Sequence, residues 1–174
     1  MWLKRTWYGG FCVLGLAALV WGYQQGYRVN LSASYPPGIY QIIDQSQRVR
    51  VGDLVLFCPP NTPDLREALV RGYIKPGPCP GYFQPAVKKV AALPGTMVSL
   101  SHAIQLNGVT VPDAVVQRSD SEGRPLPRLA SFVVPPATVL LLSDYAPVWS
   151  FDSRYYGAVP QDHILGHITP VFNF

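Results

Sequence analysis

The sequence predicts a mainly β protein, in which an antiparallel β-sheet or barrel-like domain is carried on a single N-terminal transmembrane helix. Two observations predict this class. Only 14% of the 174 residues are charged, whereas about 25% is usual in soluble domains, so a membrane segment, a β-rich body or both are expected. Beyond one apolar stretch near the N-terminus, short apolar runs alternate with turn residues, among them 15 Gly and 18 Pro, a pattern typical of strands joined by turns.

The apolar stretch runs from Trp7 to Tyr23 and follows two basic residues, Lys4 and Arg5. Its roughly 17 residues are the lower limit for crossing the hydrocarbon layer, and the aromatic residues at both ends suit membrane interfaces. We expect residues 1–28 to form a basic start and a transmembrane anchor with a cytoplasmic N-terminus, and residues 29–174 to form one exported domain. A cleaved signal peptide, which has the same basic start and apolar run, is the alternative.

Several runs in the body are rich in β-forming residues and are bounded by turn residues. The strongest local signal spans residues 104–111, where two short strands meet at Asn107-Gly108, a pair that accepts the positive φ angles of a type I′ turn. The other expected strands are Gly38–Ile43, Asp53–Phe57, Val87–Leu93, Thr138–Leu142 and Ile164–Phe172.

One short helix is expected over Pro63–Gly72, because Thr62 can cap it, proline suits its first position and the glycine can end it. The stretch Lys75–Gly81 is dense in proline and glycine and is expected to be a loop without regular structure.

Two cysteines, Cys58 and Cys79, lie beyond the apolar stretch, in a compartment where disulfides form. A bridge between them would close a loop of about 20 residues and would stabilise the domain by roughly 3 kcal/mol. We favour the disulfide, and two free buried thiols are the alternative.

Two serines, Ser32 and Ser34, follow the apolar stretch closely and should lie near the membrane surface. The residues after them, Tyr35-Pro36-Pro37-Gly38, are stiff, because proline fixes φ and holds the preceding residue extended. Such a ledge can present a hydroxyl to a substrate. The alternative, which the local sequence alone favours, is a polar linker between the anchor and the domain.

Lys88 and Lys89 are neighbours within the expected strand Val87–Leu93. Neighbouring strand residues face opposite sides of a sheet, so one lysine should point inward if one face is buried. A buried lysine loses its charge readily, and its neutral amine can then take a proton from a serine hydroxyl. An edge strand with two solvated lysines is the alternative.

Asp152 and Arg154 are two residues apart, and a structural ion pair is the leading interpretation of this spacing. No metal site is expected, because His163 and His167 lie among helix-breaking residues and no third ligand is evident. The net charge is only +4 and the basic residues are scattered, so no nucleic-acid partner is expected.

Four segments occur in an order that is informative. They are the serine ledge, Arg50–Val55 (RVGDLV), Lys88–Gly95 (KKVAALPG) and Asp152–Pro160 (DSRYYGAVP). In this order they resemble the boxes of the type I signal (leader) peptidases, which usually contain Arg-x-Gly-Asp-x-Val, Lys-Arg-x-x-Gly-Leu-Pro-Gly and Asp-Ser-Arg-Tyr-Trp-Gly-x-Val-Pro. The resemblance covers most of the chain beyond the expected anchor and implies a serine endopeptidase with a β-rich fold.

Two segments depart from the pattern of that family. Ser34–Gly38 (SYPPG) stands where the family usually has Ser-Met-x-Pro-Thr, and Ser143–Trp149 (SDYAPVW) differs from the usual Gly-Asp-Asn-Arg-Asp-Asn. The Ser-x-Pro-x-Gly-Ile-Tyr sequence, the two external cysteines and the short body are more similar to the TraF-type peptidases of conjugative transfer systems.

The resemblance implies roles for residues that match the boxes. Ser34 is the nucleophile and Lys88 is the general base, while Lys89 faces away. The Ser34 amide and the Ser32 hydroxyl donate hydrogen bonds to the oxyanion.

The resemblance also implies supporting residues: Ser150 orients the lysine amine, and Asp152 and Arg154 brace the site without reacting. No cofactor or metal is implied.

The similarity to TraF-type peptidases implies a pilin precursor as substrate, with the acyl group passing either to water or to an amine of the pilin, which closes it into a ring. It also implies a place on the periplasmic side of a bacterial inner membrane, beside a conjugative type IV secretion complex. Two alternatives stay open. One is a general type I signal peptidase that acts on secreted proteins, and the other is a non-catalytic, membrane-anchored scaffold module of a secretion complex.

Overall fold

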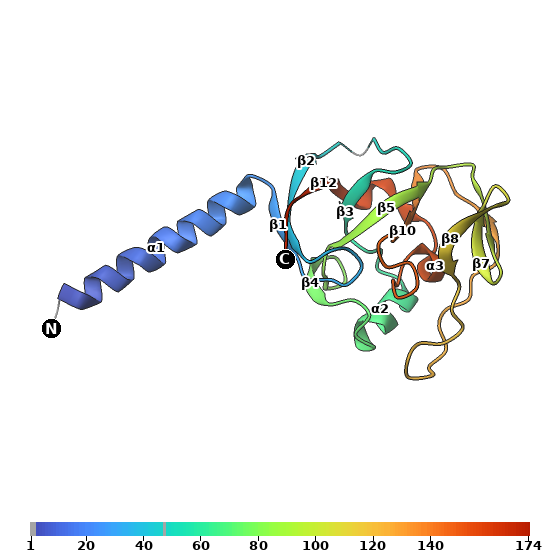
Figure 1. Ribbon diagram of the computed structural model, residues 1–174, viewed down its shortest axis with the longest axis horizontal. Helices are drawn as coiled ribbons and strands as arrows, with labels where there is room; N and C mark the ends of the chain where they lie inside the picture. The colour runs from blue at the N-terminus through green and yellow to red at the C-terminus, as the bar shows by residue number, and fades with distance from the viewer. Residues whose placement is uncertain (1–2, 47) are drawn as a thin grey trace.

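The structure is a computed structural model that describes residues 3–46 and 48–174, and the side chains of residues 13–46 and 48–174. Figure 1 shows one long helix, α1 (Leu3–Gln24), projecting from a β-rich body. The side chains of Lys4 and Arg5, where we predict a basic start, lie outside the described residues. Among the helices that the structure describes, none has the combined length and apolar character needed to cross a membrane.

Two sheets form the body. The larger has seven strands in the order β1 (Tyr27–Asn30), β2 (Gly38–Asp44), β12 (Ile164–Asn173), β3 (Leu54–Phe57), β5 (Ala86–Ala92), β10 (Thr138–Leu142) and β11 (Val159–Pro160). The smaller has four, in the order β8 (Val109–Val115), β7 (Ala103–Leu106), β6 (Met97–Leu100) and β9 (Phe132–Val133). Neighbouring strands are antiparallel in both sheets. The prediction of a mainly β, antiparallel fold is therefore confirmed.

The longer predicted strands coincide with β2, β3, β5, β10 and β12. Asn107 and Gly108 join β7 to β8 with φ angles of 50° and 82°, which confirms the predicted turn. The sequence pattern does not predict β1, β6, β9 or β11, which have two to four residues each. Unlike the equally short β3 (LVLF), β1 (YRVN) and β6 (MVSL) have no unbroken apolar run.

Helix α2 (Pro63–Val70) begins and ends close to the predicted positions. The Thr62 hydroxyl oxygen accepts a hydrogen bond from the Leu65 amide at 3.3 Å and so caps the first turn. Beyond the last turn, Gly72 has a φ angle of 78°, a backbone conformation that ends a helix and that glycine adopts without strain.

The prediction that Lys75–Gly81 lacks regular structure is wrong, because Pro76–Cys79 forms the short strand β4, which pairs with Phe83. The prolines of this strand stand at alternate positions. The Gly77 amide between them donates a hydrogen bond to the Tyr82 carbonyl at 2.9 Å. Prolines whose missing donors fall on the unpaired side of an edge strand do not prevent pairing on the other side.

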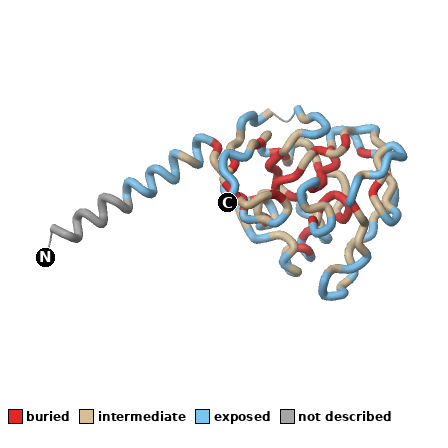
Figure 2. The backbone as a smooth tube through the Cα atoms, in the orientation of Figure 1, coloured by how far each residue is buried: buried red, intermediate tan, exposed pale blue. Residues whose placement is uncertain are grey.

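The centre of the core lies on β3, β5 and β10. The side chains of Val55, Phe57, Val90, Val139 and Leu141 are at most 1% exposed there. A second cluster, which includes Leu140, Val98 and Ile104, packs β10 against the smaller sheet. Figure 2 shows the buried residues concentrated in the middle of the body. The strand β5, which carries both lysines, is therefore held rigidly.

Cys58 and Cys79 form a disulfide with their Cα atoms 5.5 Å apart, as predicted. The bridge closes the segment that contains α2 and β4 and ties it to the end of β3. The side chains of Leu65, inside this segment, and of Phe83, just beyond it, are fully buried and pack with Cys79.

Replacing both Cys58 and Cys79 by serine should lower the free energy of unfolding by about 3 kcal/mol, because the closed loop restrains the unfolded chain. Urea unfolding with and without dithiothreitol measures the effect. The double variant should unfold at the same urea concentration in both buffers, whereas the native protein should lose stability in the reductant. Equal midpoints for the native protein in the two buffers would contradict the prediction.

Candidate active site

A cleft of about 960 Å³ brings together residues that are far apart in the sequence. Ser32 and Ser34 reach it from the loop between β1 and β2, Lys88 reaches it from β5, and Ser150 reaches it from the loop between β10 and α3 (Ser153–Tyr156). Much of the remaining lining is apolar and includes Phe57, Leu65, Ile74, Phe151 and Tyr156. Every residue that we predicted to face a substrate therefore lines one cleft.

The loop that carries Ser34, residues 31–36, is shaped by the buried side chain of Asn30. The Asn30 Nδ2 group donates hydrogen bonds to the carbonyls of Tyr35 and Pro36, each at 3.1 Å. Its Oδ1 atom accepts from the Ser32 amide at 3.1 Å and from the Ser32 hydroxyl at 2.8 Å. Because the two prolines that follow Tyr35 have no amide hydrogen, this side chain supplies the donors that hold the loop. We refer to residues 31–36 as the nucleophile loop.

Lys88 points into the protein and Lys89 points away from it, as the strand alternation predicts. Lys88 is only 2% exposed. Desolvation lowers the pKa of the Lys88 amine from 10.5 to about 8, while the Asp152 carboxylate acts to raise this pKa and the Arg154 guanidinium acts to lower it. A substantial fraction of the amine is therefore neutral at mildly alkaline pH, as a general base requires.

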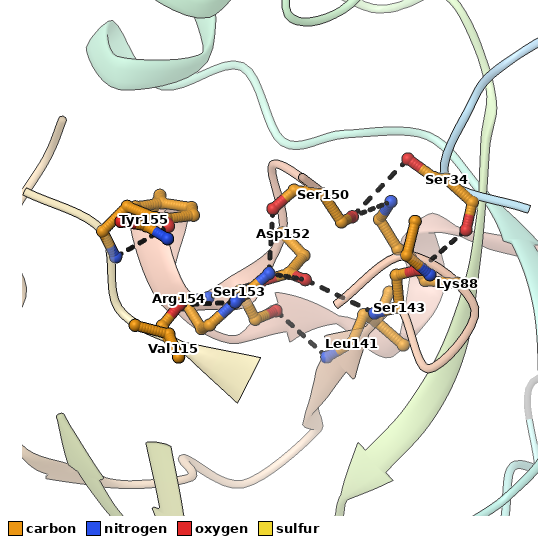
Figure 3. Close-up of polar contacts among 12 residues, drawn as sticks. Ser34, Lys88, Val115, Leu141, Ser143, Ser150, Asp152, Ser153, Arg154 and Tyr155 are labelled. Carbon is orange, nitrogen blue, oxygen red and sulfur yellow. Dashed lines mark hydrogen bonds and ion pairs between the residues drawn. The ribbon is translucent and has the colours of Figure 1, made fainter. Parts of the chain in front are cut away.

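Ser150 lies between Lys88 and Ser34 (Figure 3). The Lys88 Nζ atom donates a hydrogen bond to Ser150 Oγ at 2.7 Å, and Ser150 Oγ lies 3.5 Å from Ser34 Oγ. Among the residues that the structure describes, the Ser150 hydroxyl is the group that connects Lys88 to Ser34. The hydrogen bonds run from the Lys88 amine to the Ser150 hydroxyl and from that hydroxyl toward Ser34 Oγ, so Ser150 fixes the position of the amine beside the Ser34 hydroxyl.

Ser143 also holds the nucleophile loop, although sequence analysis assigns it no role. Its hydroxyl donates to the Ser34 carbonyl at 2.6 Å and accepts from the Ala146 amide at 3.0 Å. The Ser143 amide donates to the Asp152 carboxylate at 3.3 Å. Ser143 and Asn30 could not be found from the sequence, because each acts by contacting backbone groups that only the fold brings near.

Asp152 and Arg154 form the predicted ion pair, with both side chains fully buried. Arg154 Nε lies 2.8 Å from one carboxylate oxygen of Asp152, and Nη2 lies 2.9 Å from the other. The guanidinium also donates to the carbonyls of Val115 at 2.7 Å and Ser150 at 2.9 Å (Figure 3). The pair therefore fixes the backbone at Ser150, behind the cleft.

Replacing Asp152 by asparagine should destabilise the fold by about 3–5 kcal/mol, because it leaves the buried charge of Arg154 without a counter-charge. The matched control is Glu67→Gln, which breaks the exposed pair with Arg71 on α2 and should cost less than about 1 kcal/mol. Thermal or urea unfolding of the two variants measures the difference. An equal loss of unfolding free energy in the two variants would show that the buried ion pair stabilises the fold no more than the exposed one.

A serine hydroxyl close to a buried amine, on the wall of a cleft in an antiparallel β body, is an arrangement found in peptidases that pair a serine nucleophile with a lysine base. The site therefore resembles that of a serine peptidase. The family described as "Signal peptidase, peptidase S26" matches residues 2–172, and the chain belongs to this family.

Relatives with similar sequences are named as conjugal or plasmid transfer proteins. The chain is 43% identical over 157 residues to the conjugal transfer protein TraF of Agrobacterium fabrum, which covers 90% of this chain and 88% of the relative. It is 37% identical over 169 residues to the plasmid transfer protein TraF of Escherichia coli, covering 95% and 93% of the two chains. Among solved structures, a signal peptidase I from Enterococcus faecalis V583 is 23% identical, covers 70% of this chain and 97% of its own, and has a TM-score of 0.39.

Proposed function

We propose that this chain is a Ser/Lys-dyad endopeptidase that matures a pilin precursor for conjugative transfer. One observation carries the proposal: the buried amine of Lys88 and the hydroxyl of Ser34 lie on either side of the Ser150 hydroxyl, at the wall of one cleft. Membership of the signal peptidase family and the names of the relatives agree with it.

In the proposed mechanism, Ser34 Oγ attacks the carbonyl carbon of the scissile peptide bond. The neutral Lys88 amine takes up the serine proton, with Ser150 orienting the amine through their 2.7 Å hydrogen bond. The protonated amine then donates this proton to the departing amine of the substrate, and an acyl-enzyme ester on Ser34 remains.

The oxyanion of the tetrahedral intermediate needs donors close to Ser34. We assign this role to the Ser34 amide and the Ser32 hydroxyl. Because the Ser32 hydroxyl donates to Asn30 Oδ1 in the structure, it must rotate toward the substrate as charge develops. Asp152 and Arg154 do not react in this scheme and hold the Ser150 backbone in place.

The acyl group has two possible acceptors. Attack by water releases a trimmed linear pilin, whereas attack by an amine of the pilin itself closes a ring and expels the enzyme serine. Incubating the purified protein with a candidate pilin precursor and weighing the product tests the proposal, because a ring is one water lighter than the trimmed linear chain. Equal processing of ordinary secretory precursors would favour a general signal peptidase. An intact precursor would favour a scaffold without catalytic activity.

We place the site of action on the periplasmic side of a bacterial inner membrane, with residues 1–28 as the attachment and residues 29–174 as the catalytic domain. The disulfide supports an oxidising compartment. The apolar side chains of Val13, Leu14, Leu16 and Leu19 on α1 are 64–73% exposed, as a lipid-facing segment requires. Alkaline carbonate extraction of membranes distinguishes an attachment that spans the bilayer, which resists extraction, from one that lies on its surface.

The pH dependence of cleavage should follow the Lys88 amine. Because the base acts when neutral and its pKa is about 8, kcat/KM should rise with pH and level off above pH 8. At two pH units below the pKa, the rate should be roughly a hundredfold lower than on the plateau. Initial rates from pH 6 to 9.5 with one peptide substrate measure the profile. A rate that stays constant across this range would argue against a lysine base.

A further inference from the structure

Tyr35, the residue after Ser34, has its side chain in a different cavity from the cleft. This second cavity has a volume of about 390 Å³, and its lining includes Tyr35, Lys89, Asp144 and Tyr145. Tyr35 is only 7% exposed, and its ring stacks on Tyr145 with the ring centroids 6.2 Å apart. The nucleophile loop is therefore in contact with the protein on both sides.

One carboxylate connects the loop to the strand that carries both lysines. The Tyr35 hydroxyl donates to Asp144 Oδ1, and the Lys89 ammonium donates to Asp144 Oδ2. Tyr35 is the sequence neighbour of Ser34, and Lys89 is the sequence neighbour of Lys88. The three side chains, which we call the clasp, thus join the neighbours of the two proposed catalytic residues.

The charges in the clasp favour strong hydrogen bonds. Burial, together with the hydrogen bond to Asp144, raises the pKa of Tyr35, so the hydroxyl remains a donor. Partial burial acts to raise the pKa of Asp144, but the hydrogen bonds from Lys89 and Tyr35 outweigh this effect and lower it. A neutral donor and a cationic donor therefore share one ionised acceptor, which makes both hydrogen bonds charge-assisted.

A second attachment lies one residue away. Ser143 precedes Asp144 in the chain, and its hydroxyl holds the Ser34 carbonyl at 2.6 Å. Two consecutive residues of the β10–α3 loop thus form hydrogen bonds with two consecutive residues of the nucleophile loop, Ser143 with Ser34 and Asp144 with Tyr35. Two attachment points restrict rotation of the loop as well as its displacement.

These contacts join the two segments that depart from the signal peptidase pattern. Tyr35 stands where that pattern has methionine, which has no hydrogen to donate. Ser143 stands where Gly-Asp-Asn-Arg-Asp-Asn begins with glycine, and Asp144 matches the aspartate that follows. The two departures are 109 residues apart in the sequence, yet they meet in one set of contacts.

We propose that Tyr35, Asp144 and Lys89 are positioning residues, which together hold the nucleophile loop against β5. This inference rests on the proposed function, because positioning Ser34 matters only if Ser34 is the nucleophile. Ser34 Oγ lies 3.5 Å from Ser150 Oγ, at the long end of hydrogen-bond distance, so a further displacement of the loop separates the nucleophile from its base. A misplacement of about 1 Å can lower a rate by roughly a hundredfold.

The first test measures cleavage by variants that remove single contacts. Tyr35→Phe keeps the ring and its stacking but loses the hydroxyl, and Lys89→Met loses the charge, whereas Lys89→Arg keeps it. We expect kcat to fall about tenfold in Tyr35→Phe and Lys89→Met, with KM unchanged and with the same pH profile, because Lys88 keeps its surroundings. Lys89→Arg should retain most of the native kcat. The control is Tyr82→Phe, at a residue that is 81% exposed and lies outside both cavities.

The second test needs no substrate. Exchange of the Ser32 amide, which donates to Asn30 Oδ1, should be about tenfold faster in Tyr35→Phe than in the native protein, as expected from losing one hydrogen bond to a charged group. Exchange should be unchanged in Tyr82→Phe. If exchange of the Ser32 amide is the same in Tyr35→Phe and in the native protein, the clasp does not hold the loop and the inference is overturned.

The two tests also separate the inference from the proposed function. Faster exchange with an unchanged kcat would show that the clasp restrains the loop without positioning the nucleophile, which overturns the inference alone. A native protein that cleaves no precursor would overturn the proposed function, while the exchange measurement would still decide whether the clasp holds the loop.

Discussion

Replacing Ser34 by alanine is expected to reduce the rate of peptide-bond cleavage at least about 10⁴-fold, because the acyl-enzyme cannot form without this hydroxyl. The fold should be unaffected, since the Ser34 hydroxyl makes one long contact, at 3.5 Å from Ser150 Oγ. The measurement is kcat/KM for a peptide that spans the cleavage site of the proposed pilin substrate, together with the thermal midpoint of each protein.

Two other serine substitutions serve as comparisons for Ser34→Ala. Ser101→Ala, in the exposed loop between β6 and β7, should leave the rate unchanged. Ser32→Ala should lower the rate by about 10²–10³-fold, the effect of removing one oxyanion donor. If Ser34→Ala cleaved the peptide at the native rate, Ser34 would not be the nucleophile.

Replacing Lys88 by methionine is expected to abolish cleavage and at the same time to stabilise the fold. Folding lowers the pKa of this amine from 10.5 to about 8, so below pH 8 the folded protein holds a buried charge that the unfolded chain exposes to water. The native protein should therefore gain stability as the pH rises from 8 to 10.5. At pH 7 the methionine variant should be more stable by up to about 3 kcal/mol, less the lost hydrogen bond to Ser150.

Lys89→Met separates the two lysines of β5. Lys89 is partly exposed and pairs with Asp144, so its loss should reduce kcat by about tenfold and should give no gain in stability. Urea unfolding at pH 7 and at pH 10.5 measures both variants, and the gain from Lys88→Met should vanish at the higher pH. Full activity in Lys88→Met with loss of activity in Lys89→Met would assign the base to the other lysine.

Much of the fold follows from local patterns in the sequence. Asn107-Gly108 predicts its own hairpin, because few other residue pairs accept two positive φ angles. The alternation along β5 predicts that one lysine is buried. In contrast, the sequence does not predict β4, because its prolines look incompatible with a strand. Their alternate positions permit pairing along one edge, and only the structure shows which edge is paired.

The candidate site is only partly predictable, for a different physical reason. The local sequence already marks Ser34 and Lys88 as candidates. Ser34 precedes a stiff proline-rich segment, and Lys88 lies in a strand with one buried face. Ser143 acts on Ser34 across 109 positions of sequence, and Asn30 acts on carbonyl groups that the prolines leave without local donors. Contacts of this kind have no periodicity or composition that a sequence pattern could contain, so only the folded chain reveals them.

The Cys58–Cys79 bridge has a consequence for when a newly made copy can become active. Pro59, Leu65, Ile74 and Lys75 lie between the two cysteines and line the cleft. In the cytosol, where thioredoxin and glutathione keep thiols reduced, this segment lacks its covalent tie and depends on packing around Leu65 and Phe83. In the proposed periplasmic setting, completion of the cleft is coupled to export, and we expect a copy that still awaits export to bind substrate less well than the oxidised protein.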